Sequence, residues 1–494
     1  MIKKVLLFLM VSMSSLFLVA CKENSALGIK DLTTYTISAN LDTENYIMEC
    51  TQKINVYNNE DQSLTELKLH LYPKAFKVGA KNQPVSALNT SQAYPNGTSY
   101  GDIVINSCFQ NQEEKSFYLE GDDDNILVIP LSEELKVDKY TEISLDYTIT
   151  LPNINHRFGY SNNAINLGNF YPILCVFENG EYSTNPYSSN GDPFYSDIAN
   201  YKVDITYPSN YIIAYSGILL ENKDDGLYRT SSFYAENVRD FAMSLSTKFL
   251  QKNSKVDGVE IYYYYYNDEN PDTSLKACED SLKTFNKLFG KYPYQQLSVC
   301  ETNFVHGGME YPNLVFISDD ISSYNDYINT IVHEIAHQWW YGMVGNDEFS
   351  YGWLDEGLTE YSTALFYEEN PDYQVTMKEI VTNTTNSYLL FVQVYTDVFG
   401  NCNTKMDRQL NQYDTEPEYV YIAYVKAFLL FNEIREIVGK EKFIKGLQNY
   451  FNEYKGKNVT PENFIQCMEK STGRPISEII YNYIDGKVII LANE

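Results

Sequence analysis

The sequence is short of positive charge. Its 494 residues contain 37 Lys and Arg against 66 Asp and Glu, which leaves a formal net charge of −29 at pH 7. Because such an acidic surface repels phosphate groups, the composition argues against nucleic acid or anionic lipid as a charge-driven partner. Apolar residues make up 44% of the chain and aromatic residues 15%, with 45 tyrosines, so a folded protein of roughly two to four domains is expected.

The chain also lacks closely spaced cysteine pairs. Without a CxxC element, a zinc site built on cysteine is not expected. We interpret most of the thiols as small buried apolar groups, although export would permit a disulfide. The seven cysteines after Cys21 are Cys50, Cys108, Cys175, Cys278, Cys300, Cys402 and Cys467.

Long apolar runs are absent except at the amino terminus. Lys3 and Lys4 precede an apolar segment that ends at Ala20, which is typical of a secretory signal peptide over residues 1–20. The sequence Leu-Val-Ala-Cys ending at Cys21 resembles the lipobox of bacterial lipoproteins, so we expect a lipidated Cys21 and a tether over residues 21–33. The alternative is an ordinary signal peptide with a chance cysteine. The expected location is the bacterial cell envelope, outside the cytoplasm and anchored to the membrane by lipid.

Two regions differ in their periodicity. Residues 34–249 read as short strands separated by Asn, Asp, Gly and Pro clusters, which predicts an all-β saddle or sandwich domain. Residues 160–197 form a long Asn-, Ser-, Gly- and Tyr-rich stretch that is either a functional lining or a decorated connection. Residues 250–494 predict a separate α+β domain that becomes mostly helical from residue 327 onward. Strands are expected from Val259 to Tyr266 and from Leu297 to Phe304, and another runs without a break from Met309 to Ser318.

An HExxH element lies in the second region. His333, Glu334 and His337 fall on a stretch whose apolar residues follow helical spacing, so both imidazoles share one face, a turn apart, as a common zinc ion requires. Glu356 follows His337 after eighteen residues and is the candidate third ligand on a neighbouring helix. The alternative interpretation is a pair of structural histidines on a core helix.

These motifs carry a resemblance to a known family. HExxH with the spaced Glu in Trp-Leu-Asp-Glu-Gly resembles the gluzincin zinc aminopeptidases, the family of aminopeptidase N and leukotriene hydrolase. The segment Gly307-Gly308-Met309-Glu310-Tyr311 resembles the GxMEN exopeptidase motif of that family, and Tyr424-Val425-Lys426-Ala427 resembles its YxKG element. The resemblance implies a thermolysin-like catalytic domain over residues 250–494.

The resemblance also implies roles for these residues. One zinc ion per chain, held by His333, His337 and Glu356, would activate a water molecule for attack on a peptide bond. Glu334 would act as general base, and Tyr424 would stabilise the oxyanion. The expected substrates are peptides with a free amino terminus, bound at Gly307, Gly308, Met309 and Glu310, with the Glu310 carboxylate pairing with the α-amine.

Some features depart from the family pattern or stay open. Tyr311 stands where the motif has Asn, and if it disables recognition of the amine, a zinc endopeptidase or a non-peptide hydrolase on the same scaffold is favoured. An inactive peptide-binding lipoprotein is a further alternative. Ala427 replaces the Gly of YxKG, and Glu360 is either a partner of a zinc-binding histidine or part of a solvated face. We interpret His306 as a lining residue rather than a fourth ligand. Only 70 residues follow Tyr424, so a large helical carboxy-terminal domain is not expected and the cleft should be more open.

Overall fold

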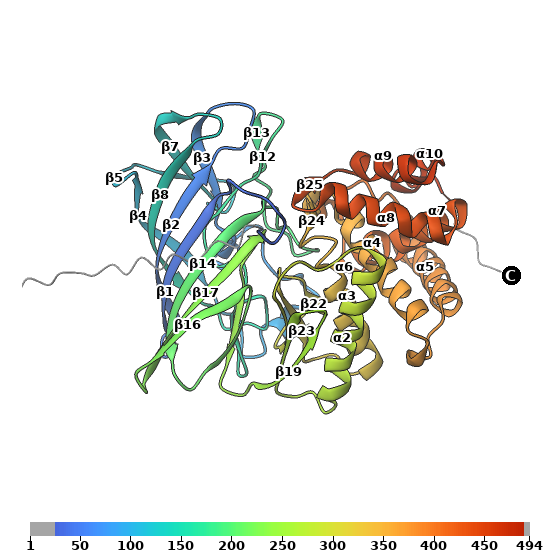
Figure 1. Cartoon of the computed structure of the whole chain (residues 1–494), viewed down its shortest axis with the longest axis horizontal. Helices are drawn as coiled ribbons and strands as arrows, with labels where there is room; N and C mark the ends of the chain where they lie inside the picture. The colour runs from blue at the N-terminus through green and yellow to red at the C-terminus, as the bar shows by residue number, and fades with distance from the viewer. Residues whose placement is uncertain (1–24, 489–494) are drawn as a thin grey trace, which may run out of the picture.

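The computed structural model describes residues 25–488 as two regions that lie side by side, one rich in strands and one rich in helices (Figure 1). This arrangement confirms the predicted fold class of an all-β domain followed by a mostly helical α+β domain. The predicted signal peptide, Cys21 and the start of the tether lie outside the described residues. Within residues 25–488, no helix combines the length and the apolar character that a membrane span needs.

The β-rich region is organised around an eight-stranded sheet. Its strands alternate between buried and exposed residues, so one face packs on the core while the other meets solvent. Strand β1 runs parallel to β14 and antiparallel to β2. In spatial order the sheet contains β16 (Ile218–Asp224), β17 (Tyr228–Val238), β14 (Ala199–Pro208), β1 (Thr34–Asp42), β2 (Ile47–Tyr57), β8 (Tyr140–Thr150), β4 (Asp102–Gln110) and β5 (Glu113–Glu114).

Three smaller sheets complete this region. The first contains β15 (Ile212–Tyr215), β18 (Met243–Ser246), β10 (Ile165–Leu167) and β9 (Phe158–Tyr160). The second contains β11 (Ile173–Leu174), β3 (Leu64–His70), β7 (Ile126–Leu135) and β6 (Tyr118–Glu120). The third pairs β12 (Phe177–Glu178) with β13 (Glu181–Tyr182). Within the long stretch at residues 160–197 the strands β10 to β13 are very short and most residues lie outside strands, and α1 (Thr90–Ala93) is a single turn.

A five-stranded sheet opens the second region. Its spatial order is β19 (Leu250–Val256), β20 (Val259–Tyr265), β21 (Gln296–Thr302), β23 (Leu314–Ser318) and β22 (Gly308–Met309). The prediction of one strand from Met309 to Ser318 is wrong, because the chain turns back at Asn313, whose φ is 63°, and β22 pairs antiparallel with β23. Strand β22 consequently forms one edge of the sheet.

Helices pack beside this sheet and fill the rest of the region. Their bounds are α2 (Pro271–Leu288), α3 (Tyr324–Ala336), α4 (Glu348–Glu369), α5 (Met377–Phe399), α6 (Glu416–Tyr419), α7 (Ala427–Val438), α8 (Lys440–Tyr454), α9 (Pro461–Thr472) and α10 (Ser477–Ile484). The π-helical segment η4 (Val420–Lys426) joins α6 to α7. A short parallel pair, β24 (Val344–Asn346) and β25 (Lys457–Val459), connects distant parts of this region.

Arg239 joins the two regions. It lies just after β17 and is fully buried, and its guanidinium donates hydrogen bonds to the carbonyls of Ser196, Tyr341 and Lys457. Gly345 lies directly against it, since a Cβ at that position would come within 2.2 Å of the guanidinium carbon. One side chain from the β-rich region therefore satisfies backbone groups on both sides of the boundary.

The seven cysteines of the described residues are all free thiols, and six of them are buried. This agrees with their interpretation as small apolar groups, and burial raises the pKa of the Cys278 thiol above its ordinary range.

Candidate metal centre and active site

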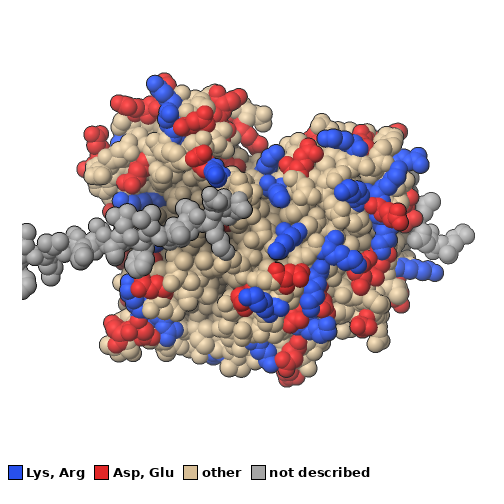
Figure 2. Space-filling view, in the orientation of Figure 1, with Lys and Arg blue, Asp and Glu red and all other residues tan. Residues whose placement is uncertain are grey.

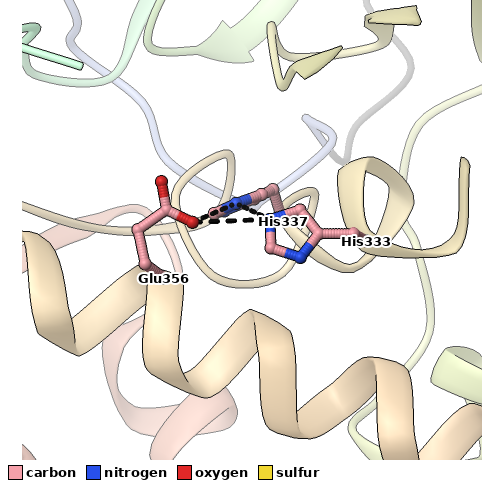
Figure 3. A group of neighbouring side chains, drawn as sticks. All are labelled: His333, His337 and Glu356. Atoms are coloured by element: carbon pink, nitrogen blue, oxygen red, sulfur yellow. Dashed lines mark hydrogen bonds and ion pairs between the residues drawn. The ribbon is translucent and has the colours of Figure 1, made fainter. Parts of the chain in front are cut away.

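Two histidines of α3 face one another in the core. The helix begins at Tyr324, about one turn before the helical pattern expected from residue 327, and the Ser323 hydroxyl caps it by accepting from the backbone N–H of Asp326. His333 lies in the last turn and His337 at the carboxy-terminal cap, and their Nε2 atoms are 3.1 Å apart. The helical spacing of four residues thus brings both rings to one point (Figure 3).

Glu356 reaches the same point from α4. Its Oε2 lies 3.4 Å from Nε2 of His333 and 3.2 Å from Nε2 of His337. The carboxylate projects from the long helix that passes beside the histidines (Figure 3). Tyr351 has non-helical dihedral angles near the start of α4, so the helix is kinked one turn before this ligand. All three residues are buried, and together they can hold one metal ion.

The outer ring nitrogens of both histidines are also engaged. Nδ1 of His333 lies 3.2 Å from Oε1 of Glu360, and Nδ1 of His337 lies 2.9 Å from the carbonyl oxygen of Trp340. A ring that donates from Nδ1 presents the lone pair of Nε2 to a metal. Glu360 is therefore a partner of His333 rather than part of a purely solvated face.

Charge in this cluster favours a cation. Burial disfavours an ionised carboxylate, yet His337 and His333 outweigh it and lower the pKa of Glu356 to about 2. Burial likewise disfavours a charged His337, but the carboxylates of Glu310 and Glu356 raise its pKa to about 10. Two imidazole nitrogens and one ionised carboxylate oxygen, all buried, are a donor set that suits Zn²⁺.

Glu334 lies beside the cluster with one oxygen free of hydrogen bonds. Its Oε2 is buried without a partner, and burial raises the pKa of the carboxyl to about 7 despite the opposing effect of both histidines. Gly308 packs directly on it, because a Cβ at that position would meet Oε1 of Glu334 at 2.3 Å. Only a residue without a side chain leaves this carboxylate its place.

Glu310 follows β22 and lines the same pocket. Its Oε1 is buried and has no hydrogen-bond partner. Burial, reinforced by Asp192, raises the pKa of this carboxyl well above its ordinary range. A buried oxygen without a donor is suited to receive one from a ligand.

The residues beside Glu310 differ in whether they line the pocket or are buried away from it. Gly307 and Gly308 line the pocket, whereas the Met309 side chain is fully buried in the core, so contact with a peptide would fall to its backbone. The Tyr311 side chain is buried too, and its phenol donates a 2.7 Å hydrogen bond to Oδ1 of Asn169 in the β-rich region. Tyr311 is not among the lining residues, so it leaves Glu310 accessible to the pocket.

Tyr424 lies in η4, where the π-helical winding shifts its position on the helix. Its phenol donates a 2.5 Å hydrogen bond to Oε1 of Glu356, the oxygen that does not face the histidines. The replacement of Gly by Ala427 is accommodated because Gly357 lies opposite, where a Cβ would come within 2.3 Å of the Ala427 Cβ. Lys426, which immediately precedes Ala427, is buried and donates to the carbonyls of Thr404 and Tyr483.

The pocket around these residues has a volume of about 380 Å³ and draws walls from both regions. Arg157 and Asp192, which sequence reasoning missed, line it from the β-rich region and form an ion pair in which Arg157 is buried and Asp192 is partly exposed. Asp192 and the neighbouring Gly191 are the residues of the long stretch 160–197 that line the pocket, and no motif in the sequence indicated them. His306 lines the pocket and pairs with Glu416 at 3.4 Å, as expected for a lining residue.

Known proteins share these features. Residues 273–483 match the peptidase family M1 domain. Leucine aminopeptidase 2 of Aspergillus fumigatus is 30% identical over 183 residues, which are 35% of this chain and 28% of that protein. Aminopeptidase B of Rattus norvegicus is 29% identical over 202 residues, or 38% of this chain and 30% of that protein. Leukotriene A-4 hydrolase of Xenopus laevis is 27% identical over 226 residues, or 43% of this chain and 33% of that protein. The chain thus spans about a third of the length of the curated relatives it matches.

One group of solved structures covers much more of the chain. The M1 zinc metallopeptidase from Deinococcus radiodurans matches with a TM-score of 0.64 over 94% of this chain and 96% of that one, at 14% identity, which establishes a shared fold. The resemblance to the gluzincin family that the motifs predict is confirmed by the match of residues 273–483 to the peptidase family M1 domain and by this shared fold.

Proposed function

We propose that this protein is a zinc aminopeptidase that removes the first residue from peptides with a free amino terminus. One observation carries the proposal: the His333, His337 and Glu356 cluster and the unpaired carboxylate oxygen of Glu310 open into a single pocket. The first group suits a metal and the second an ammonium group. The names of the aminopeptidase relatives, and the Tyr-Ser-Ala substrate bound to a mutant of the Deinococcus radiodurans enzyme, support the proposal.

His333, His337 and Glu356 would hold the zinc ion. When bound there, Zn²⁺ polarises a carbonyl and lowers the pKa of water. Glu360 and the Trp340 carbonyl orient the two imidazoles, and Tyr424 restrains the second oxygen of Glu356. The donor atoms are therefore arranged before any ion binds, which limits the conformational entropy that binding costs.

Glu334 is placed to move the proton. A carboxyl whose pKa lies at about 7 is divided between its ionised and protonated forms at neutral pH, so it can accept a proton from water and pass it to a leaving amine. Its unpaired Oε2 is the atom available for this transfer. The Tyr424 phenol, close to the cluster, is the group proposed to donate to the developing oxyanion once it leaves Glu356.

Glu310 would bind the substrate α-amine and so restrict cleavage to the first peptide bond. A substrate ammonium supplies the donor that Oε1 lacks and favours the ionised form of this buried carboxyl. Because Tyr311 is turned into the β-rich region, its presence in place of Asn leaves this anchor intact.

The test compares the wild-type protein with Glu334→Gln on aminoacyl and N-acetyl-aminoacyl fluorogenic substrates, with zinc measured in both proteins. We expect cleavage of the free amine only, and retention of zinc with loss of turnover in the variant. Equal cleavage of the acetylated substrates would instead support an endopeptidase or another hydrolase. Unchanged turnover in the variant would falsify the role of Glu334, and binding without any turnover in the wild type would support a peptide-binding lipoprotein.

We further propose that the protein is exported and anchored by lipid at Cys21. The signal-like residues 1–20 and the lipobox-like sequence before Cys21 support this location. Replacing Cys21 with Ala should move the protein from the membrane fraction to the soluble extracytoplasmic fraction. Equal membrane retention of the two proteins would contradict a lipid anchor.

A further inference from the structure

The direction in which a peptide crosses the pocket follows from the order of residues along the edge strand. Glu310 lies just after β22, Gly308 within it packs on Glu334, and His306 precedes it. A peptide with its amine at Glu310 that extends along this free sheet edge passes Glu334 first and His306 next. The residue after the cleaved bond therefore lies on the wall formed by Gly307, His306 and Thr330, since a Cβ at Gly307 would lie 4.0 Å from Thr330.

That wall contains a carboxylate that the reaction does not use. Glu416 of α6 places Oε1 3.4 Å from Nδ1 of His306, and its Oε2 accepts hydrogen bonds of 3.0 Å from Ser86 and 2.7 Å from Asn89. Burial opposes ionisation, yet the bonds from His306, Ser86 and Asn89 lower the pKa of Glu416. The side chain is thus fixed, ionised and still partly exposed to the pocket.

The charges that line the pocket leave a negative excess. The lining carboxylates are Asp192, Glu310, Glu334, Glu356, Glu360 and Glu416. Among the described lining residues, Arg157 is the one Lys or Arg, and the Asp192 carboxylate neutralises it. A zinc ion would compensate Glu356, and a substrate amine Glu310.

Glu416 and Glu360 keep charges that no lysine or arginine of the pocket balances. Glu360 is paired with His333. Glu416 is therefore the carboxylate that faces the part of a peptide after the cleaved bond.

We infer that the pocket prefers peptides with a cationic side chain on the residue just after the cleaved bond, and that Glu416 receives this side chain. The inference rests on the proposed aminopeptidase function, because the amine at Glu310 sets the direction of the peptide. A partly buried carboxylate held by three donors costs a lysine or arginine little reorganisation to pair with.

The experiment uses three peptides that differ only at the second residue: Ala-Lys-Ala-amide, Ala-Leu-Ala-amide and Ala-Glu-Ala-amide. We expect kcat/KM to be about fivefold higher for the Lys peptide than for the Leu peptide, the scale of one partly exposed ion pair, and lowest for the Glu peptide. The preference should shrink as salt is raised. A ratio near one at low salt would overturn the inference.

Glu416→Gln is the diagnostic variant because the amide can keep hydrogen bonds to His306 and Ser86 while losing the charge. The ratio between the Lys and Leu peptides should fall toward one in this variant. Glu441→Gln, which removes one exposed charge at the start of α8, away from the pocket, is the matched control and should keep the ratio. An unchanged ratio in Glu416→Gln, or an equal fall in the control, would overturn the assignment to Glu416.

A second measurement separates this inference from the proposed function. The zinc-loaded Glu334→Gln protein should bind the Lys peptide more tightly than the Leu peptide in calorimetry, and Glu334→Gln combined with Glu416→Gln should not. Such a preference in binding without cleavage by the wild type would support the pocket selectivity and contradict the peptidase. Cleavage of all three peptides at equal rates, with equal affinities, would support the peptidase and contradict the pocket selectivity.

Discussion

The two regions contribute to one pocket in different ways. The helical region holds every predicted metal ligand, the proposed base and Tyr424, all between residues 333 and 424. The β-rich region contributes walls such as the Arg157 and Asp192 pair, together with the side chain that joins the regions, Arg239. The reacting groups are thus local in sequence, whereas the shape of the pocket depends on contacts between distant segments.

Removing a metal ligand should have the largest effect. Glu356→Ala removes the ionised oxygen of the donor set and the acceptor of Tyr424. We expect zinc content to fall below one-tenth and activity by at least about 10³-fold, while the unfolding midpoint of the β-rich region changes little. Metal analysis and fluorogenic assays measure the first two quantities. Full zinc occupancy in this variant would show that Glu356 is not needed as a metal ligand.

Breaking the contact between the regions should be the next largest effect. Arg239→Met leaves three backbone carbonyls without their donor, so the free energy of unfolding should drop by about 3–5 kcal/mol. Denaturant titration measures this change. Arg474→Met, at an exposed arginine, is the control and should alter stability by less than about 0.5 kcal/mol. Equal effects would mean that the regions do not depend on Arg239.

A single methyl group at Gly308 should lower activity without loss of zinc. In Gly308→Ala the new Cβ displaces Glu334, and activity should fall about 10²-fold with zinc still bound, the scale of losing general-base catalysis. In Gly307→Ala the Cβ has open space, with its nearest neighbour at 4.0 Å, and activity should stay within a few-fold of the wild type. If both variants lose activity equally, the backbone of the edge strand matters rather than the place of Glu334.

The smallest effect should come from Tyr311→Phe. Loss of the hydrogen bond to Asn169 should cost about 1 kcal/mol of stability, measured by denaturant unfolding, and leave the preference for free amines unchanged. Tyr100→Phe, at an exposed tyrosine, is the control. A loss of the preference for free amines in Tyr311→Phe would show that this phenol helps to hold the amine anchor.

The residues that are close together in the sequence could be predicted, whereas the walls that depend on distant segments could not. Helical spacing brings His333 and His337 together on one helix, and the motif interval adds Glu356, so the cluster that can hold a metal ion was predictable. The turn at Asn313 interrupts a segment that was predicted as one strand, although Pro312 and Asn313 within it are residues typical of turns. Arg157 and Asp192 could not be found, since they lie 35 residues apart and meet only in the folded chain.

The hydrogen bond from Tyr311 to Asn169 has a consequence for how an aminopeptidase would measure its substrate. The strand that presents Glu310 is tied through this bond to the β-rich region, while the metal ligands belong to α3 and α4. The backbone beside Glu310 is also held from the helical region, because the Gln338 side chain, just after α3, donates to the carbonyls of Glu310 and Tyr311. The amine anchor is therefore fixed from both sides of the boundary, and a shift of the β-rich region would pull on the residue next to Glu310 while leaving the three residues proposed to bind the metal in place.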